Sequence, residues 1–327
     1  MDLFTHVLVA YLITYGLVGF HPQYLAAGAL AGGLPDGDAL FFPIARRFPI
    51  LRHHGITHSV VGVSAVAVVG ALVGPHLAPG NPWLYLLVLE AGGLAHIAQD
   101  GFTNFSVPAL MPFSGREFHL DADRAVNFVT LAISVVSFYL LLGIERNHVA
   151  FALYLYTIDA IAAFFAVYFA LRLAARFTLG RRLPRIGDYD HVVPTSNPFV
   201  WILISERVAN GRERTSWARY VLGRGVVAGP YSADAPVAPQ RHPGVPSNAT
   251  EALEWSLGLA REASATIAGT YHFGEAFADP DGGWTAVWYS LEFTMFGRSA
   301  AVRVRFTPGD RPAEVRTAFY RPKAPAV

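Results

Sequence analysis

The sequence predicts a helical integral membrane domain followed by a small soluble α+β domain. Hydrophobic residues make up 53% of the 327 residues and charged residues only 15%, and the mean hydropathy is +0.35, so the chain is more apolar than ordinary soluble proteins. Long apolar runs stop near Arg172, and an alternating pattern of period two begins near residue 186. We therefore expect a membrane domain over residues 1–180 and a soluble domain over residues 186–327.

The apolar runs predict about six membrane spans. A helical span needs about 20 residues to cross a hydrocarbon core of about 30 Å. The second run is short because it ends at Pro35-Asp36-Gly37-Asp38, so this element either stops at the interface or forms a broken helix beside a polar cavity. Five and six spans both remain open on length alone. The runs occupy residues 7–20, 24–34, 59–79, 83–99, 126–144 and 149–171.

The arginine positions favour six spans. In that arrangement one side of the membrane receives only Arg146, and the other side receives all the remaining arginines of this region. Basic residues concentrate on the cytoplasmic side, so we predict an inner-membrane protein with both termini in the cytoplasm. The arginines assigned to that side are Arg46, Arg47, Arg52, Arg116, Arg124, Arg172, Arg176, Arg181, Arg182 and Arg185.

The C-terminal part has the pattern of antiparallel strands with one helix. Polar and apolar residues alternate from Trp284 to Phe293 and again from Val302 to Phe306, as in strands with one buried face. Thr250 is expected to cap a helix over residues 251–263. The stretch 231–248 is rich in Pro, Ala and Ser, which predicts a loop.

Charge and cysteine content exclude several classes of function. Basic and acidic residues nearly balance, 25 against 24, so no global field attracts a polyanion and we predict no nucleic-acid partner. The chain contains no cysteine, which excludes disulfides, thiolate nucleophiles and cysteine-ligated metal sites. Any bound metal ion must therefore be held by His, Asp or Glu.

Ionisable residues gather at the ends of the apolar runs, on one predicted side of the membrane. Charged groups near a bilayer are costly and mark functional sites. His96 and Asp100 are four residues apart, so they share one helix face and can both reach one ion. The candidate metal ligands are His6, Asp36, Asp38, His53, His58, His96 and Asp100.

Local sequence explains how these side chains can converge. Gly37 lets the backbone bend so that the two flanking aspartates point inward. Gly55 should interrupt regular secondary structure, and Thr57 can cap a helix that starts at His58. His53 and His58 could then approach each other. Helix caps and solvated turns would explain each residue singly, but not the whole set on one side. Histidine and carboxylate ligands without sulfur suit zinc, manganese or iron, as one or more ions.

The same residues resemble a known family in order and approximate spacing. This is the YdjM-like family of membrane-bound proteins described as metal-dependent hydrolases, and the match spans roughly residues 5–125. His53 and His58 fall on the two histidines of one family motif, and His54 replaces its usual arginine, which removes a group that could contact an anion. The motifs are Thr5-His6, Leu34-Pro35-Asp36-Gly37-Asp38, His53-His54-Gly55-Ile56-Thr57-His58-Ser59 and His96-Ile97-Ala98-Gln99-Asp100.

The resemblance implies a function at the membrane surface. The family is distantly similar to zinc-dependent phospholipases C, so it implies hydrolysis of a phosphoester or another ester, lipids included, with zinc as the best-suited metal. We expect an ion-activated water to be the nucleophile and Asp36 or Asp38 to accept its proton as the catalytic base.

Two other functions stay open from sequence. A non-catalytic metal-binding membrane scaffold or regulator would use its soluble domain to recruit a cytoplasmic protein partner. A transporter would use the broken second helix and Asp159 as an ion path, and would need its ligands near mid-membrane rather than at helix ends.

Overall fold

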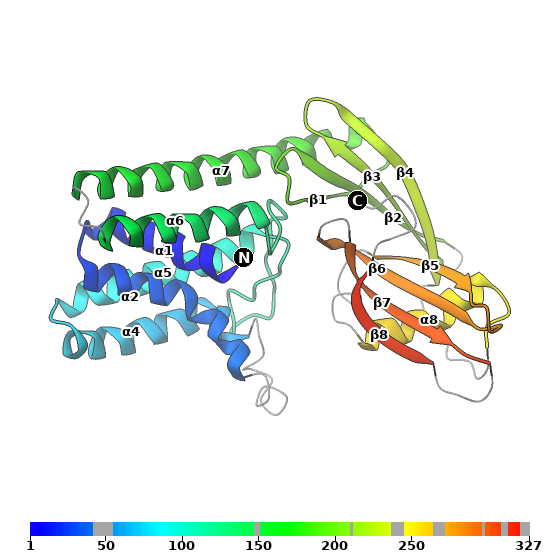
Figure 1. Cartoon of the computed structure of the whole chain (residues 1–327), viewed down its shortest axis with the longest axis horizontal. Helices are drawn as coiled ribbons and strands as arrows, with labels where there is room; N and C mark the ends of the chain where they lie inside the picture. The colour runs from blue at the N-terminus through cyan, green and yellow to red at the C-terminus, as the bar shows by residue number, and fades with distance from the viewer. Residues whose placement is uncertain are drawn as a thin grey trace. The chain divides into compact units, whose positions relative to one another are not determined.

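The computed structural model describes residues 1–41, 55–146, 151–209, 212–236, 245–263, 272–295, 298–308 and 313–320. The chain divides into two compact units, Met1–Phe177 and Thr178–Val327. The described residues of the first unit are mainly helical, and those of the second form antiparallel sheets with one helix (Figure 1). The predicted order, a helical part followed by a strand-rich part, is confirmed.

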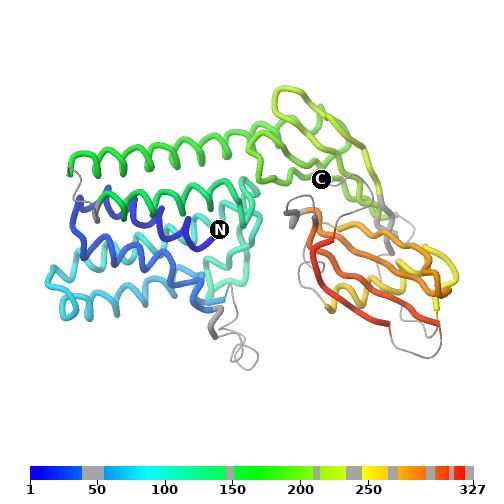
Figure 2. The backbone as a smooth tube through the Cα atoms, in the orientation of Figure 1, coloured from blue at the N-terminus to red at the C-terminus, as the bar shows by residue number. Residues whose placement is uncertain are grey.

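Each predicted apolar run forms a helix in the first unit, and the helices lie side by side (Figure 2). Two short 3₁₀ helices contain candidate metal ligands: η1 (Pro35–Phe41) contains Asp36 and Asp38, and η3 (Ile56–His58) contains His58. The last helix, α7, runs across the boundary between the units. The α-helices are α1 (Leu3–Val18), α2 (Pro22–Gly33), α4 (Val60–Leu77), α5 (Pro82–Phe102), α6 (Phe128–Arg146) and α7 (Phe151–Ile186).

Side-chain caps define where these helices begin. Asp2 accepts a hydrogen bond from the backbone of Thr5 at the start of α1, and Asn81 accepts one at the start of α5. Ser59 caps α4 by accepting from the backbone N–H of Gly62 at 3.1 Å. The expectation that Thr57 caps a helix starting at His58 is therefore wrong. Ser59 is the first hydroxyl placed before the continuous apolar segment, and Thr57 is used by the polar site instead.

Among the described residues, α4 and α7 are the two helices long and apolar enough to cross a membrane, so the expectation of about six spans is wrong. The helices α1 and α2 have 16 and 12 residues, and the apolar part of α6 is also short. In contrast α5 has 21 residues, but it contains Glu90, His96, Gln99 and Asp100. The helices that carry the polar cluster are thus too short or too polar to count as helices that could cross a membrane.

The helices of the first unit pack closely where glycines face a neighbouring backbone. A Cβ placed on Gly32 of α2 would lie 2.4 Å from the Cβ of Ala10 on α1, and one on Gly92 of α5 would lie 2.3 Å from the carbonyl oxygen of Gly28 on α2. Neither distance leaves room for a side chain, which explains glycine at both positions. This close approach brings α1, α2 and α5 together beneath the polar motifs.

A buried ionic network joins the segment before α6 to α7. The carboxylate of Asp123 accepts hydrogen bonds from Arg172 at 2.9 Å, Tyr168 at 2.7 Å and Asn127 at 2.8 Å. Asp123 is fully buried, Arg172 is 1% exposed, and Arg124 is also buried. Arg172 and Arg124, which the sequence assigned to the cytoplasmic side, are therefore buried within the helical unit.

The second unit contains two four-stranded antiparallel sheets with the strands in sequence order. Trp217 of the first sheet stacks on Phe273 of the second with ring centroids 4.6 Å apart, inside a core shared by both sheets. The strands are β1 (His191–Pro194), β2 (Val200–Ala209), β3 (Arg212–Val221) and β4 (Gly225–Pro236), then β5 (His272–Ala278), β6 (Trp284–Met295), β7 (Arg298–Phe306) and β8 (Glu314–Tyr320).

Helix α8 (Ala249–Ala263) packs on the second sheet of this unit. Its Ser256 hydroxyl accepts a hydrogen bond from the indole of Trp288 at 2.9 Å, so the buried tryptophan keeps its polar group satisfied. The helix lies where the sequence predicted it, but Asn248 rather than Thr250 accepts the capping bond, from the N–H of Glu251. The predicted loop at 231–248 is also wrong at its start, since β4 continues to Pro236.

Candidate metal centre

A cluster of histidines and aspartates forms where four elements of the helical unit meet. His6 lies in the second turn of α1, Asp36 in η1, and His96 with Asp100 in the last turns of α5. One ligand atom from each of these four residues lies within 4.8 Å of the ligand atoms of the other three. Residues separated by more than 90 positions in sequence therefore face one point, and they could hold a metal ion.

The carboxylate of Asp100 is at the centre of the cluster. Its Oδ1 lies 3.0 Å from Nε2 of His6, and its Oδ2 lies 3.2 Å from Nε2 of His96. The same Oδ2 lies 3.7 Å from Nε2 of His58, which ends η3. The amino group of Met1 also contacts Oδ1, so a positive charge already lies against this carboxylate. Asp100 thus interacts with every histidine of the cluster.

Asp36, in the 3₁₀ helix η1, contacts two of the same imidazoles. Its Oδ1 lies 3.7 Å from Nε2 of His58 and 3.8 Å from Nε2 of His96. The rings of His6 and His96 stack with their centroids 3.9 Å apart, and the ring of His58 meets His96 edge-on at 5.0 Å. The three Nε2 atoms therefore converge on the space between the two carboxylates.

The far nitrogen of His96 is fixed by the backbone. Nδ1 of His96 donates to the carbonyl oxygen of Gly32 at 2.8 Å, and a carbonyl only accepts, so Nδ1 carries the proton. Nε2 is the nitrogen that faces the cluster, where it can offer a lone pair to an ion. This is the usual arrangement of a histidine that ligates a metal.

Asp38 lies behind His58 rather than among the converging ligand atoms. Its Oδ2 is 3.3 Å from Nδ1 of His58 and accepts a hydrogen bond from the hydroxyl of Thr57 at 2.6 Å. Because Nε2 of the same ring faces Asp36 and Asp100, Asp38 orients His58 from its far side. A carboxylate behind a histidine fixes the ring and raises its basicity.

Burial supports the interpretation of the cluster as a cation site. The side chains of His6, His58 and His96 are fully buried, and Asp100 is 1% exposed. Within the described residues, both ring nitrogens of His6 and Nε2 of His96 make no hydrogen bond. A buried polar atom without a partner is costly. A divalent ion between the imidazoles and the carboxylates would satisfy these nitrogens, so the residues present fit such an ion.

Asp36 in η1 and His58 in η3 shift each other's pKa. Burial alone would raise the pKa of Asp36, but its hydrogen bond with His58 and the charge of His96 outweigh burial and hold the pKa below its ordinary value. Burial alone would lower the pKa of His58, but its hydrogen bonds with Asp36 and Asp38 raise the pKa to about 9. Without a metal ion, the cluster therefore keeps a proton on His58 at neutral pH.

The structure brings together six of the seven residues singled out from sequence. His6, Asp36, His96 and Asp100 form the converging group, with His58 beside it and Asp38 behind His58. The seventh residue, His53, lies outside the described residues, as does His54.

Sequence reasoning missed two contributors. The amino group of Met1 contacts Asp100, and the carbonyl of Gly32 holds His96. No sequence pattern indicates which backbone carbonyl a histidine will reach.

Comparison with known proteins agrees with this part of the molecule. No curated protein and no solved structure matches the chain. A sequence model of the YdjM inner membrane protein family matches residues 1–180, a segment that contains every residue of the candidate metal centre. The resemblance seen in the motifs is thereby confirmed, and it places the helical unit in a membrane context. The chain belongs to the YdjM inner membrane protein family.

Proposed function

We propose that this protein is a membrane-bound, metal-dependent hydrolase of phosphoesters or other esters. The observation that carries the proposal is a buried group of imidazoles that converges on two carboxylates, in which both ring nitrogens of His6 and Nε2 of His96 make no hydrogen bond. A purely structural polar cluster would satisfy its own donors and acceptors. This cluster needs a cation to do so, and hydrolytic metal sites use the same ligand types.

The ligand set suits zinc, with manganese and iron as the alternatives. Two imidazole nitrogens, from His6 and His96, and two carboxylates, from Asp36 and Asp100, provide borderline and hard donors without sulfur. The Nε2 atom of His58 faces the same space, so a second ion has a further nitrogen available. An ion bound here supplies Lewis-acid activation of water and neutralises negative charge that develops on an ester oxygen.

Asp36 is the best candidate for the catalytic base. Its side chain is 22% exposed, whereas those of Asp38 and Asp100 are 1–2% exposed. Water and substrate can therefore reach Asp36, and its lowered pKa keeps it ionised at neutral pH. Asp38 is held by Thr57 and His58, so we assign it to positioning His58 and prefer Asp36 for the proton transfer.

The test combines metal content with hydrolysis. Full-length protein purified in detergent should contain stoichiometric metal by mass spectrometry and should hydrolyse at least one member of a panel of phosphomonoesters, phosphodiesters and acyl esters. Asp100→Asn should lose both properties, whereas Glu90→Gln on the same helix should keep both, because Glu90 accepts from Ser64 at 2.7 Å outside the cluster.

Stoichiometric metal without hydrolysis of any ester in the panel would overturn the enzyme proposal. It would leave a metal-binding scaffold, with the sheet unit as the part available to a protein partner. Absence of metal from well-folded protein, even after reconstitution, would overturn both.

A further inference from the structure

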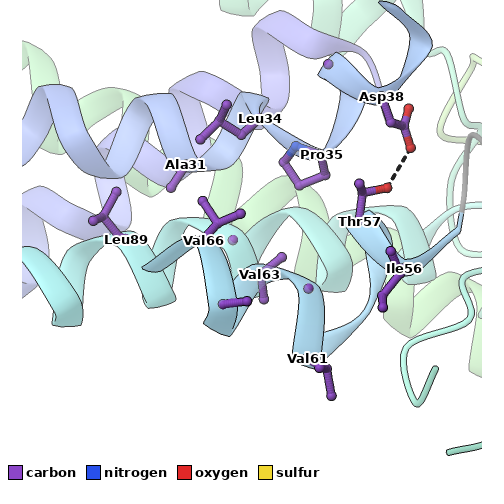
Figure 3. Close-up of a pocket in the computed structure, with 14 residues that line it drawn as sticks. Ala31, Leu34, Pro35, Asp38, Ile56, Thr57, Val61, Val63, Val66 and Leu89 are labelled. Carbon is purple, nitrogen blue, oxygen red and sulfur yellow. Dashed lines mark hydrogen bonds between the residues drawn. The ribbon is translucent and has the colours of Figure 1, made fainter. Parts of the chain in front are cut away.

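An apolar cavity of about 600 Å³ lies beside the metal centre, between α2, η1, η3, α4 and α5 (Figure 3). Its walls are hydrocarbon, with Ala31, Leu34, Val66 and Leu89 from three different helices among the lining residues. The volume is within the range of about 300–1,000 Å³ that is usual for small-molecule sites. The cavity is therefore large enough to bind a ligand rather than being a packing defect.

Only one end of the cavity offers polar side chains. Asp38 and Thr57 are the lining residues with polar side chains, and they are hydrogen-bonded to each other, as Figure 3 shows. Asp38 is also 3.3 Å from Nδ1 of His58, whose Nε2 faces the metal centre. The polar end of the cavity is thus one imidazole ring away from the converging ligands.

The walls determine what can fill this space. A buried water needs about two to four polar partners, and most of this cavity offers none. We therefore expect the apolar part of the cavity to be free of water. The wall formed by α4 belongs to a candidate membrane span, and Val61 and Val66 on it are 37% and 45% exposed. In a membrane protein this exposed face meets lipid chains. Hydrocarbon from the bilayer is therefore the material that matches the cavity.

The depth of the cavity suits a hydrocarbon chain whose polar end lies at the metal centre. Leu89 lies seven residues before His96 on α5, which corresponds to about 10 Å along the helix axis. A chain lying against Leu89 would therefore extend from the apolar interior toward the helix ends that carry the ligands. Its polar end would arrive next to Asp38 and Thr57.

We propose that this cavity holds the hydrocarbon chain of a lipid substrate, which enters from the bilayer and presents its ester to the metal centre. The inference rests on the proposed hydrolase function and specifies its substrate class. Because a chain moving from bilayer to cavity gains no hydrophobic free energy, the shape of the cavity has to select it. Filling the cavity should therefore exclude the chain without disturbing the rest of the protein.

Photolabelling tests the proposal directly. The full chain is placed in bilayer discs containing phosphatidylethanolamine with a diazirine on one acyl chain, then illuminated, and the labelled peptides are mapped by mass spectrometry. Leu89 and Ala31 are only 7% and 4% exposed and line the cavity, so label on them reports entry of a chain. Val69 is 61% exposed on α4 and does not line the cavity, so label there reports general contact with lipid.

A matched pair of variants makes the test specific. Val66→Phe adds bulk at an exposed cavity wall, and we expect it to lower the labelling of Leu89 by about tenfold or more. Ala65→Phe, one residue earlier on the same wall, should act in the same way. Val69→Phe carries the same change outside the cavity and should leave the labelling of Leu89 unchanged. Equal labelling in Val66→Phe and Val69→Phe would overturn the proposal.

The outcomes separate this inference from the proposed function. Asp100→Asn should lose metal and hydrolysis but keep the labelling of Leu89, because Asp100 does not line the cavity. Labelling of Leu89 without hydrolysis of any ester would support chain binding and contradict the hydrolase. Hydrolysis of a soluble short ester by wild type, with label on Val69 but none on Leu89, would support the hydrolase and overturn the lipid substrate.

Discussion

Two buried carboxylates in the same helical unit have opposite surroundings. Asp123 accepts hydrogen bonds from a guanidinium, a phenol and an amide, provided by Arg172, Tyr168 and Asn127. Asp100 faces the imidazoles of His6, His58 and His96. Both aspartates are almost fully buried, so burial alone does not distinguish their roles.

The difference lies in the partners. A guanidinium and a phenol bring their own protons, so the Asp123 network satisfies its carboxylate within the protein. Nε2 of His6 and Nε2 of His96 face the carboxylates of the cluster without a hydrogen bond, and a carboxylate cannot satisfy a nitrogen lone pair. The Asp100 cluster therefore needs a cation, whereas the Asp123 network only ties α7 to the preceding segment. Charge pairing holds the fold in one region and forms a binding site in the other.

Removing the central carboxylate of the cluster should have the largest effect. Asp100→Asn keeps the size of the side chain but removes the charge that interacts with all three histidines. Loss of a residue that only hydrogen-bonds a metal ligand lowers metal affinity by up to about 100-fold. Asp100 is itself a candidate ligand, so we expect a larger fall in affinity. Metal content by mass spectrometry and affinity by competition with a chelator measure this effect.

Glu90→Gln is the matched control for that substitution. It makes the same chemical change on α5 but retains an acceptor for Ser64, so metal affinity should not change. Equal loss of metal in both variants would show that the cluster around Asp100 is not the site.

Breaking the other network should affect stability rather than metal binding. Asp123→Ala removes the carboxylate that forms an ion pair with Arg172, which is 1% exposed, and breaking a buried ion pair costs about 3–5 kcal/mol. Thermal unfolding in detergent should show the loss, while the metal bound per folded molecule stays at the wild-type value. Loss of metal from the folded variant would contradict the separation of the two networks.

The pH dependence of metal binding should reflect the proton on His58. Its pKa is raised from 6.5 to about 9, so this proton stabilises the metal-free fold at low pH, and its contribution disappears as the pH rises through about 9. If Asp36 and Asp100 bound a divalent ion, their negative charge would no longer stabilise the proton on His58. Metal binding should then release about one proton below pH 9, and affinity should rise about tenfold per pH unit.

Calorimetry in two buffers of different ionisation enthalpy measures the released proton. His58→Gln should abolish the release while the other ligands remain in place. Proton release that persists in His58→Gln would assign the proton to another group.

The smallest effect should come from the hydroxyl behind Asp38. Thr57→Val removes the 2.6 Å hydrogen bond to Asp38 and loosens the carboxylate that orients His58. We expect metal affinity to fall by about tenfold, the lower range for an outer partner. Thr57→Ser keeps the hydroxyl and should retain the wild-type affinity, which separates loss of the bond from loss of the methyl group.

Much of this protein could be predicted from its sequence alone. Long apolar runs specify helices because their side chains must be removed from water, and period-two alternation specifies strands because successive side chains face opposite sides. Ionisable residues such as His96 and Asp100 were conspicuous because charge at the end of an apolar segment is costly. These properties are local, so the order of elements and the candidate ligands could be read from the chain.

The tertiary structure decided what depends on distant segments meeting. Only the contact of α5 with α2 places the Gly32 carbonyl at Nδ1 of His96, and only the meeting of η1 with η3 puts Asp38 behind His58. Only the tertiary structure shows that Arg172 is buried in an ion pair with Asp123. Composition does not determine which partner satisfies a buried polar group, because that depends on distances of a few ångströms between segments far apart in sequence.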